Sequence, residues 1–147
     1  MKQLFKICIV FLVLPAWASA QDDEWPPLSY LRSDYKAVSV VAHIRIEQAE
    51  ITNRIGGYEN WKIKGVVLES FKGRFKKGDA IEYFHGAEAG FKQQYFTGEK
   101  IVFLLAERDP KLHYVVLENS TLPHTNHSVR RLRLIRKSYL SKRQRRV

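Results

Sequence analysis

Apolar and polar residues alternate along several stretches of the chain. The alternation is clearest over residues 38–46, where every even-numbered position is apolar. Successive side chains of a β-strand point to opposite faces, so this pattern predicts a half-buried strand whose even-numbered side faces a core. The "TNRIGG" that follows supplies Asn53, Gly56 and Gly57, residues that accept the positive φ of a hairpin connection.

The next run, "YENWKIKGVVLESF", predicts a second strand with a change of phase. Trp61 and Ile63 share one face, whereas Val66 and Leu68 follow the opposite parity. Gly65 lies where the parity changes. The pattern therefore predicts a β-bulge at Gly65 that bends the strand sharply.

Three later runs, "DAIEYFHG", "KIVFLLAE" and "LHYVVLE", predict a third, fourth and fifth strand. The fourth is continuously apolar, which predicts burial on both sides. Five closely spaced strands without a long helix between them indicate a small barrel or sandwich and exclude βαβ units.

The segment "FKGRFKKGD" joins the second and third predicted strands. It resembles a phosphate-binding loop in its glycines and lysines, but it lacks the Ser/Thr and the following helix that such a loop requires. We interpret it as a turn in which Gly73 and Gly78 adopt turn conformations and Asp79 hydrogen-bonds the local backbone. Its basic residues, Lys72 among them, are expected to remain in water.

Helical patterns flank the predicted strands. "LSYLRSDY" predicts a short helical turn before the first strand. Near the C-terminus, Ser128 is expected to cap a helix with one apolar stripe, and Leu134 falls off that stripe. The stripe consists of Val129, Leu132, Ile135, Tyr139 and Leu140. Alternation within "RLRLI" also permits a sixth strand in place of the helix.

The first twenty residues have the pattern of a secretory signal peptide. Lys2 and Lys6 precede an apolar run that ends at Leu14, and small residues follow up to Ala20. The run is shorter than the roughly 20 apolar residues that span a bilayer. Cleavage after Ala20 would leave Gln21 as the N-terminus of the mature chain.

The only cysteine, Cys8, lies within the predicted signal. The mature chain would therefore have no disulfide, thiolate nucleophile or cysteine metal ligand. A secreted domain without disulfides is typical of a bacterial envelope, so we expect a periplasmic or secreted protein.

Positive charge is concentrated at the C-terminal end. The formal net charge is +10, yet all 15 acidic residues precede residue 128, so the body of the chain is close to neutral. We expect the nine basic residues after this point to bind an anionic partner. They are Arg130, Arg131, Arg133, Arg136, Lys137, Lys142, Arg143, Arg145 and Arg146.

Several of these stretches resemble the netrin-like module of the tissue inhibitors of metalloproteinases, in the form found in small secreted bacterial proteins. The resemblance covers roughly residues 36–118. It is carried by "SVVAHIRIEQAE", "YENWKIKGVVLESFKGRFKKGDAIEY" and "FTGEKIVFLLAERDPKLHYVVLEN". It implies a five-stranded OB-type barrel with flanking helices. The animal inhibitors use an N-terminal cysteine, a position at which this chain is expected to have Gln21.

The predicted organisation is a signal peptide at 1–20, a leader at 21–35, a mainly β, OB-like barrel at 36–122 and a basic C-terminal segment at 123–147. No nucleophile motif appears, and we expect no catalytic residue, cofactor or metal ligand. His124 and His127 form a candidate metal pair that we interpret as solvated loop residues, and His43 is expected at the surface.

We therefore expect a non-enzymatic binding module whose partner is a protein or an anionic envelope surface of lipid or lipopolysaccharide. One alternative is binding of single-stranded nucleic acid by an OB groove, with stacking from exposed aromatic residues. The candidates for stacking are Trp61, Tyr83, Phe84 and Tyr95. A second alternative is a cysteine-free inhibitor of a metalloprotease.

Overall fold

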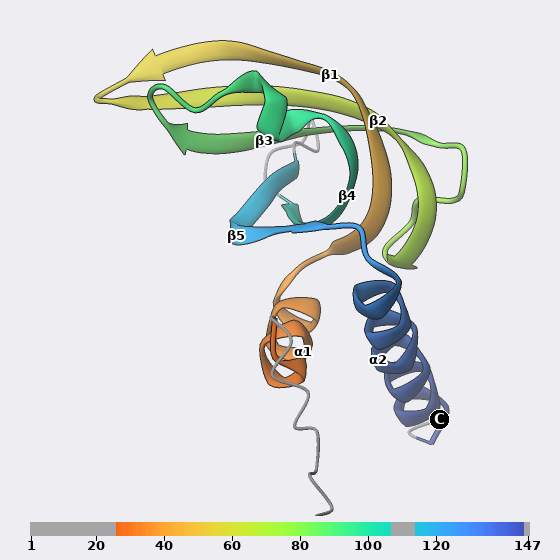
Figure 1. Cartoon of the computed structure of the whole chain (residues 1–147). Helices are drawn as coiled ribbons and strands as arrows, with labels where there is room; N and C mark the ends of the chain where they lie inside the picture. Colours follow the sequence, from red (N-terminus) through yellow and green to blue (C-terminus); the bar gives the residue numbers. More distant parts are fainter. Residues whose placement is uncertain (1–25, 107–113, 146–147) are drawn as a thin grey trace, which may run out of the picture.

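The computed structural model describes residues 26–106 and 114–145 (Figure 1). The elements in chain order are α1 (Leu28–Ala37), β1 (Val40–Ile55), β2 (Tyr58–Lys72), β3 (Ala80–Glu88), a 3₁₀ turn η1 (Gln93–Phe96), β4 (Gly98–Ala106), β5 (Tyr114–Pro123) and α2 (Asn126–Gln144). The predicted mainly β fold with a C-terminal basic helix is confirmed. The C-terminal segment is a helix, so the alternative sixth strand is excluded.

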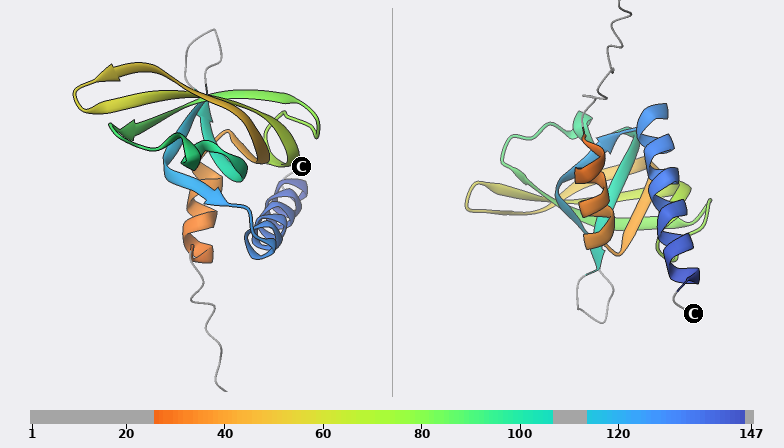
Figure 2. Two further views of the ribbon diagram at one scale, coloured as in Figure 1. Left: turned by 45° about the horizontal axis from the view of Figure 1, so that its top comes forward. Right: turned by 90° about the horizontal axis from the view of Figure 1, so that it is seen from below.

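The five strands form a closed barrel in the order β1-β2-β3-β5-β4, and β4 returns to β1. Neighbouring strands are antiparallel except β3 and β5, which are parallel and pair at Phe84 and Val115. The β1–β2 hairpin extends past the body of the barrel (Figure 2). Its turn contains Gly56 and Gly57 at φ 58° and 84°, as predicted.

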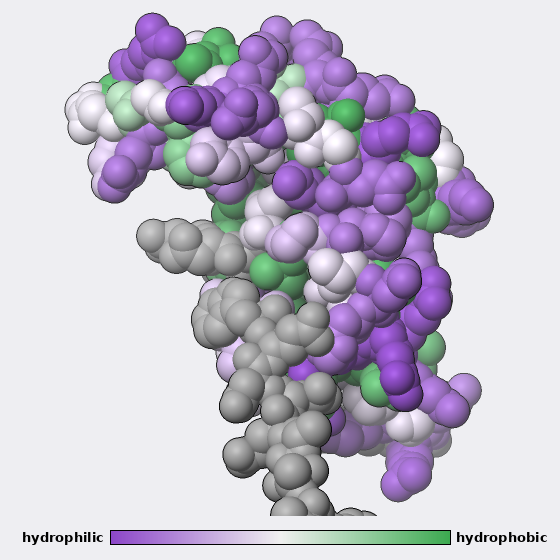
Figure 3. Space-filling model, viewed as in Figure 1, coloured by the Kyte–Doolittle hydropathy of each residue, from purple (hydrophilic) through white to green (hydrophobic). Residues whose placement is uncertain are grey.

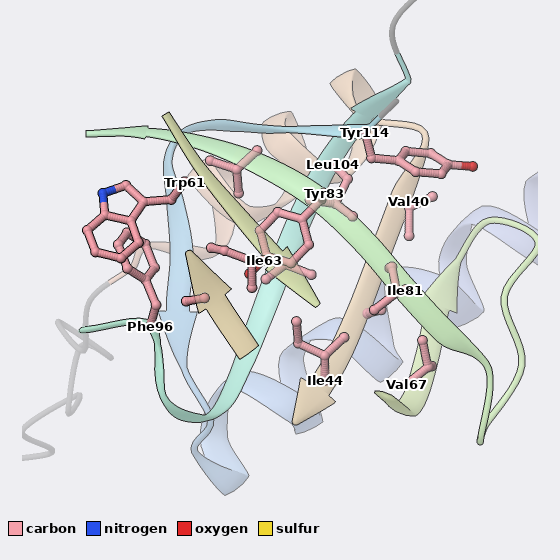
Figure 4. Close-up of a cluster of buried hydrophobic side chains, with 14 of the residues drawn as sticks. Val40, Ile44, Trp61, Ile63, Val67, Ile81, Tyr83, Phe96, Leu104 and Tyr114 are labelled. Atoms are coloured by element: carbon pink, nitrogen blue, oxygen red, sulfur yellow. The ribbon is translucent and has the colours of Figure 1, made fainter. Parts of the chain in front are cut away.

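The barrel wall separates two hydrophobic cores. The inner core fills the barrel and includes Ile44, Ile63 and Tyr83, as Figure 4 shows. The outer core lies between the barrel and the two helices, which run side by side across one face of the barrel (Figure 2, right). It consists of Leu31, Tyr35, Val38, Val41, Phe71, Ile101, Phe103, Leu122, Val129, Leu132 and Ile135.

The alternation in the sequence is explained by these two cores. On β1 the even-numbered Val40, Ala42 and Ile44 face the inner core, as predicted. The continuous apolar run in β4 is buried on both sides because Val102 and Leu104 face inward while Ile101 and Phe103 face the helices. Each side of β4 therefore needs apolar residues.

The bulge predicted in β2 at Gly65 lies instead in the opposing strand. Ile46 pairs with Gly65 and Gln48 with Lys64, so Glu47 is the extra residue and belongs to β1. The predicted change of parity does not occur at Gly65, because Ile63 and Val67 both face the inner core. It comes later in β2, where the register shifts past Leu68 and Phe71 faces the outer core. Gly65 is needed for close approach: a Cβ there would lie 2.5 Å from the backbone oxygen of Arg45.

The segment between β2 and β3 is a turn, as predicted. Gly73 and Gly78 have φ of 102° and 93°, and Asp79 Oδ2 accepts a hydrogen bond of 2.7 Å from the Lys76 N–H. Lys72 departs from the expectation that it stays in water. Its ammonium lies at the end of α1 and donates to the carbonyls of Tyr35 at 2.7 Å and Val38 at 2.6 Å.

Lys72 therefore acts as a C-terminal cap of α1. A cation at this end satisfies carbonyls that have no partner within the helix and interacts favourably with the helix dipole. Burial lowers the pKa of Lys72, which reflects the desolvation cost of placing the ammonium there.

Replacing this cap should weaken the fold. We expect Lys72→Met to lower the free energy of unfolding by about 1–2 kcal/mol, because the charged donor is lost and the carbonyls lose their partner. Chemical denaturation is the measurement. Lys77→Met is the matched control, since Lys77 is exposed in the same turn, and it should change stability by less than about 0.5 kcal/mol. Equal effects would contradict the capping role.

The start of α2 differs from the predicted cap by three residues. Thr125 precedes the helix, and its Oγ1 accepts a 3.1 Å hydrogen bond from the Ser128 N–H. Ser128 therefore lies in the first turn and Thr125 is the cap. Leu134 is exposed, as predicted, but Leu140 is also exposed and does not belong to the buried stripe.

Candidate anionic-surface interface

Helix α2 carries most of the basic residues that the sequence marks for an anionic partner. The structure divides them into residues used within the fold and residues directed to solvent. Arg146 and the side chain of Arg143 lie outside the described part of the chain, as do the predicted cleavage residues Ala20 and Gln21. The division follows from which side of α2 packs on the barrel.

Three of the arginines hold α2 in place. Arg131 is buried and its Nη1 donates a 2.8 Å hydrogen bond to the carbonyl of Pro26. Arg133 donates to both carboxylate oxygens of Glu69 at 2.9 and 2.6 Å, and these hydrogen bonds lower the pKa of Glu69. Arg136 donates to the carbonyl of Ser70 at 3.1 Å. The sequence could not separate these residues from the others.

The outward side of α2 carries a cationic stripe, which we define as Arg130 and Lys137 with Leu134 between them, continued by Arg145 directly after the end of the helix. At 100° per residue Arg130, Leu134 and Lys137 fall within an arc of about 60°. All four side chains are exposed, and the three cations make no ion pair with the described part of the chain. Lys142, also exposed, flanks the stripe near the C-terminus.

Two exposed leucines accompany these cations. Leu134 is 58% exposed and Leu140 is 53% exposed. Figure 3 shows the surface around α2 as largely hydrophilic with isolated hydrophobic side chains. A helix face that combines basic and exposed apolar residues is typical of contact with the interface of an anionic membrane. No helix in the described ranges is long and apolar enough to cross a membrane.

The aromatic candidates for base stacking are not gathered on a common exposed surface. Trp61 and Tyr83 are 4% and 1% exposed and belong to the inner core. Phe84 is half-buried, and Tyr95 alone among the four is largely exposed. The arrangement gives little support to a stacking groove.

The histidines depart most from expectation. His43 is buried, although it was predicted at the surface, because the connection from β5 to α2 covers this part of β1. Its ring stacks on His124 with centroids 3.9 Å apart, and its Nε2 lies 2.8 Å from Glu99 Oε2. Burial lowers the pKa of His43, and the hydrogen bond to Glu99 opposes that shift.

Local sequence motifs do not reveal this cluster. His124 and His127 are only three residues apart, whereas His43 and Glu99 are far from His124 in sequence. The one hint in the sequence is that His43 shares its odd-numbered side of the strand with the apolar Val41. In the structure both residues are buried on that side. His113, also expected at the surface, lies outside the described residues.

No known protein-family model matches the chain, and a search of curated proteins finds none with significant sequence similarity.

Proposed function

We propose that this chain is a secreted or periplasmic, non-enzymatic binding module that docks on anionic lipid surfaces through the cationic stripe of α2. The closed five-stranded barrel is compatible with an OB-type module and would serve as the rigid base for the helix. The observation that carries the proposal is the set of exposed cations on α2 without acidic partners in the described ranges, beside Leu134 and Leu140.

Lipid is favoured over nucleic acid by the apolar part of the surface. Leu134 lies within the stripe and Leu140 beside it, and leucine side chains gain free energy when they enter the headgroup boundary of a bilayer. A phosphate backbone offers them no comparable contact. Each exposed cation near an anionic membrane contributes about 1 kcal/mol of attraction. Three cations with one or two leucines give reversible, salt-sensitive binding.

The test reverses the charges of the stripe, and a control variant makes the same change in net charge elsewhere on the surface. In Arg130→Glu/Lys137→Glu/Arg145→Glu, three attractions become repulsions, so binding to phosphatidylglycerol-containing vesicles should weaken by at least about 100-fold. Co-sedimentation of the secreted protein at low and high salt is the measurement. Wild-type binding should fall as salt rises and be absent on phosphatidylcholine alone.

The matched control is Arg74→Glu/Lys76→Glu/Lys77→Glu, in the turn between β2 and β3. It makes the same change in net charge at three exposed positions. It should retain most of the vesicle binding. An equal loss in both triple variants would assign binding to net charge and contradict the stripe. Tighter binding to single-stranded oligonucleotides than to vesicles would instead favour the nucleic-acid alternative.

A further inference from the structure

We infer that His43, Glu99 and His124 form a binding site for one divalent transition-metal ion of the Zn²⁺ type. The three residues come from separate parts of the fold: β1, the start of β4 and the connection between β5 and α2. Their ligand atoms all lie within 4.8 Å of one another. The inference does not depend on how α2 meets a membrane.

The site has one rigid ligand and two adjustable ones. His43 lies near the start of β1, where the backbone pairs with β2 at Glu69 and with β4 at Ile101. Its ring is held by burial and by the parallel ring of His124, at an interplanar angle of 2°. Glu99 and His124 have side-chain exposures of 42% and 31%, so an ion has access from solvent.

Binding an ion requires the His124 ring to leave its stacked position on His43. Glu99 Oε2 lies 2.8 Å from His43 Nε2 and 3.6 Å from His124 Nδ1. Ligand atoms around a tetrahedral zinc are about 3.3 Å apart, given metal–ligand bonds of about 2.0–2.1 Å. Two of the three separations bracket this spacing, and all three donor atoms lie within 4.8 Å of one another. The lone pairs of two parallel stacked imidazoles cannot converge on one ion, so the partly exposed His124 ring must rotate about its side-chain bonds to bring its Nδ1 into place.

The donor set selects the class of metal. Two imidazole nitrogens with one carboxylate oxygen suit Zn²⁺, Co²⁺, Ni²⁺ and Cu²⁺, whereas Mg²⁺ and Ca²⁺ prefer sites built from oxygen alone. A three-residue site leaves a position for water or an external ligand. Because His124 directly precedes the cap residue Thr125, a bound ion would also connect the barrel wall to the start of α2.

Titration of the metal-free protein with ZnCl₂ against a chromophoric chelator tests the site. We expect one ion per chain. Zinc at roughly one hundred times its Kd should raise the Tm by about 5–10 °C, because the ion binds the folded chain in preference to the unfolded one. Mg²⁺ should leave the Tm unchanged. Co²⁺ should give visible d–d absorption bands of a site with nitrogen and oxygen ligands.

Variants assign the ligands. His124→Ala and Glu99→Gln should each weaken zinc binding by about 100-fold, since each removes one of three ligands. His127→Ala removes the nearby histidine in the first turn of α2 and should keep the Kd within about twofold of wild type. Circular dichroism verifies that each variant is folded. The inference is overturned if His124→Ala binds zinc as tightly as wild type, or if His127→Ala abolishes binding.

Discussion

Truncating the chain after Pro123 is expected to unfold the barrel, not merely to remove its positive charge. Val129, Leu132 and Ile135 are at most 6% exposed and close the outer core. Burial of each such side chain contributes about 1.5–3 kcal/mol, so the loss for the three totals roughly 5–9 kcal/mol. A domain of this size is stable by about 5–15 kcal/mol. Circular dichroism and urea denaturation should show loss of the cooperative transition.

Two controls separate packing from charge. Truncation after Leu140 also removes basic residues, but the described side chains beyond it are exposed, so it should stay folded. Leu132→Ala should cost about 3 kcal/mol. Leu134→Ala, two positions away on the exposed side, should cost less than about 0.5 kcal/mol. A truncation at Pro123 that keeps the wild-type midpoint would show that α2 is an appendage.

The second large effect is expected at Gly65. A methyl group there would lie 2.5 Å from the backbone oxygen of Arg45, and no flexible side chain is available to yield. Gly65 is paired on both sides, with Ile46 of β1 and Ile81 of β3, so neither strand can move without breaking a ladder. We expect Gly65→Ala to destabilise the protein by about 3 kcal/mol or more, measured by urea denaturation.

Gly86→Ala in β3 is the comparison for this effect. Gly86 is also a strand glycine without positive φ, but its added methyl would meet only Asn60 Oδ1 at 3.7 Å, an ordinary contact. Its effect on stability should stay within about 1 kcal/mol, with a contribution from the reduced freedom of the unfolded chain. Similar losses for both variants would show that close approach at the bulge is not the cause.

The strands were predictable because local alternation is a direct consequence of facing one core. The alternation correctly predicts the strand over residues 40–46 and the apolar run of β4, whereas residues 38 and 39 precede β1 and Val38 packs in the outer core. The bulge was placed in the wrong strand because a glycine marks a close approach without saying which strand carries the extra residue. Lys72 was misjudged because its partner, the end of α1, is brought beside it only by the closed barrel.

The candidate sites could be predicted only in part, because their contacts join segments that are far apart in the sequence. The sequence located the basic segment, and the helical period placed its apolar stripe correctly up to Ile135. It could not distinguish Arg130, which faces solvent, from Arg133, whose partner Glu69 lies on another element. The cluster at His43 depends on contacts between three distant segments, and one sequence carries no record of such contacts.

The hydrogen bond from Arg131 to Pro26 bears on how fast the polypeptide can become native. It ties the segment before α1 to α2, 105 positions later in the chain. The layer between the barrel and the helices likewise joins Leu31 to Ile135. Contacts of such long sequence separation must be closed late and slow folding relative to a fold built from local contacts, so the outer layer should form after the barrel.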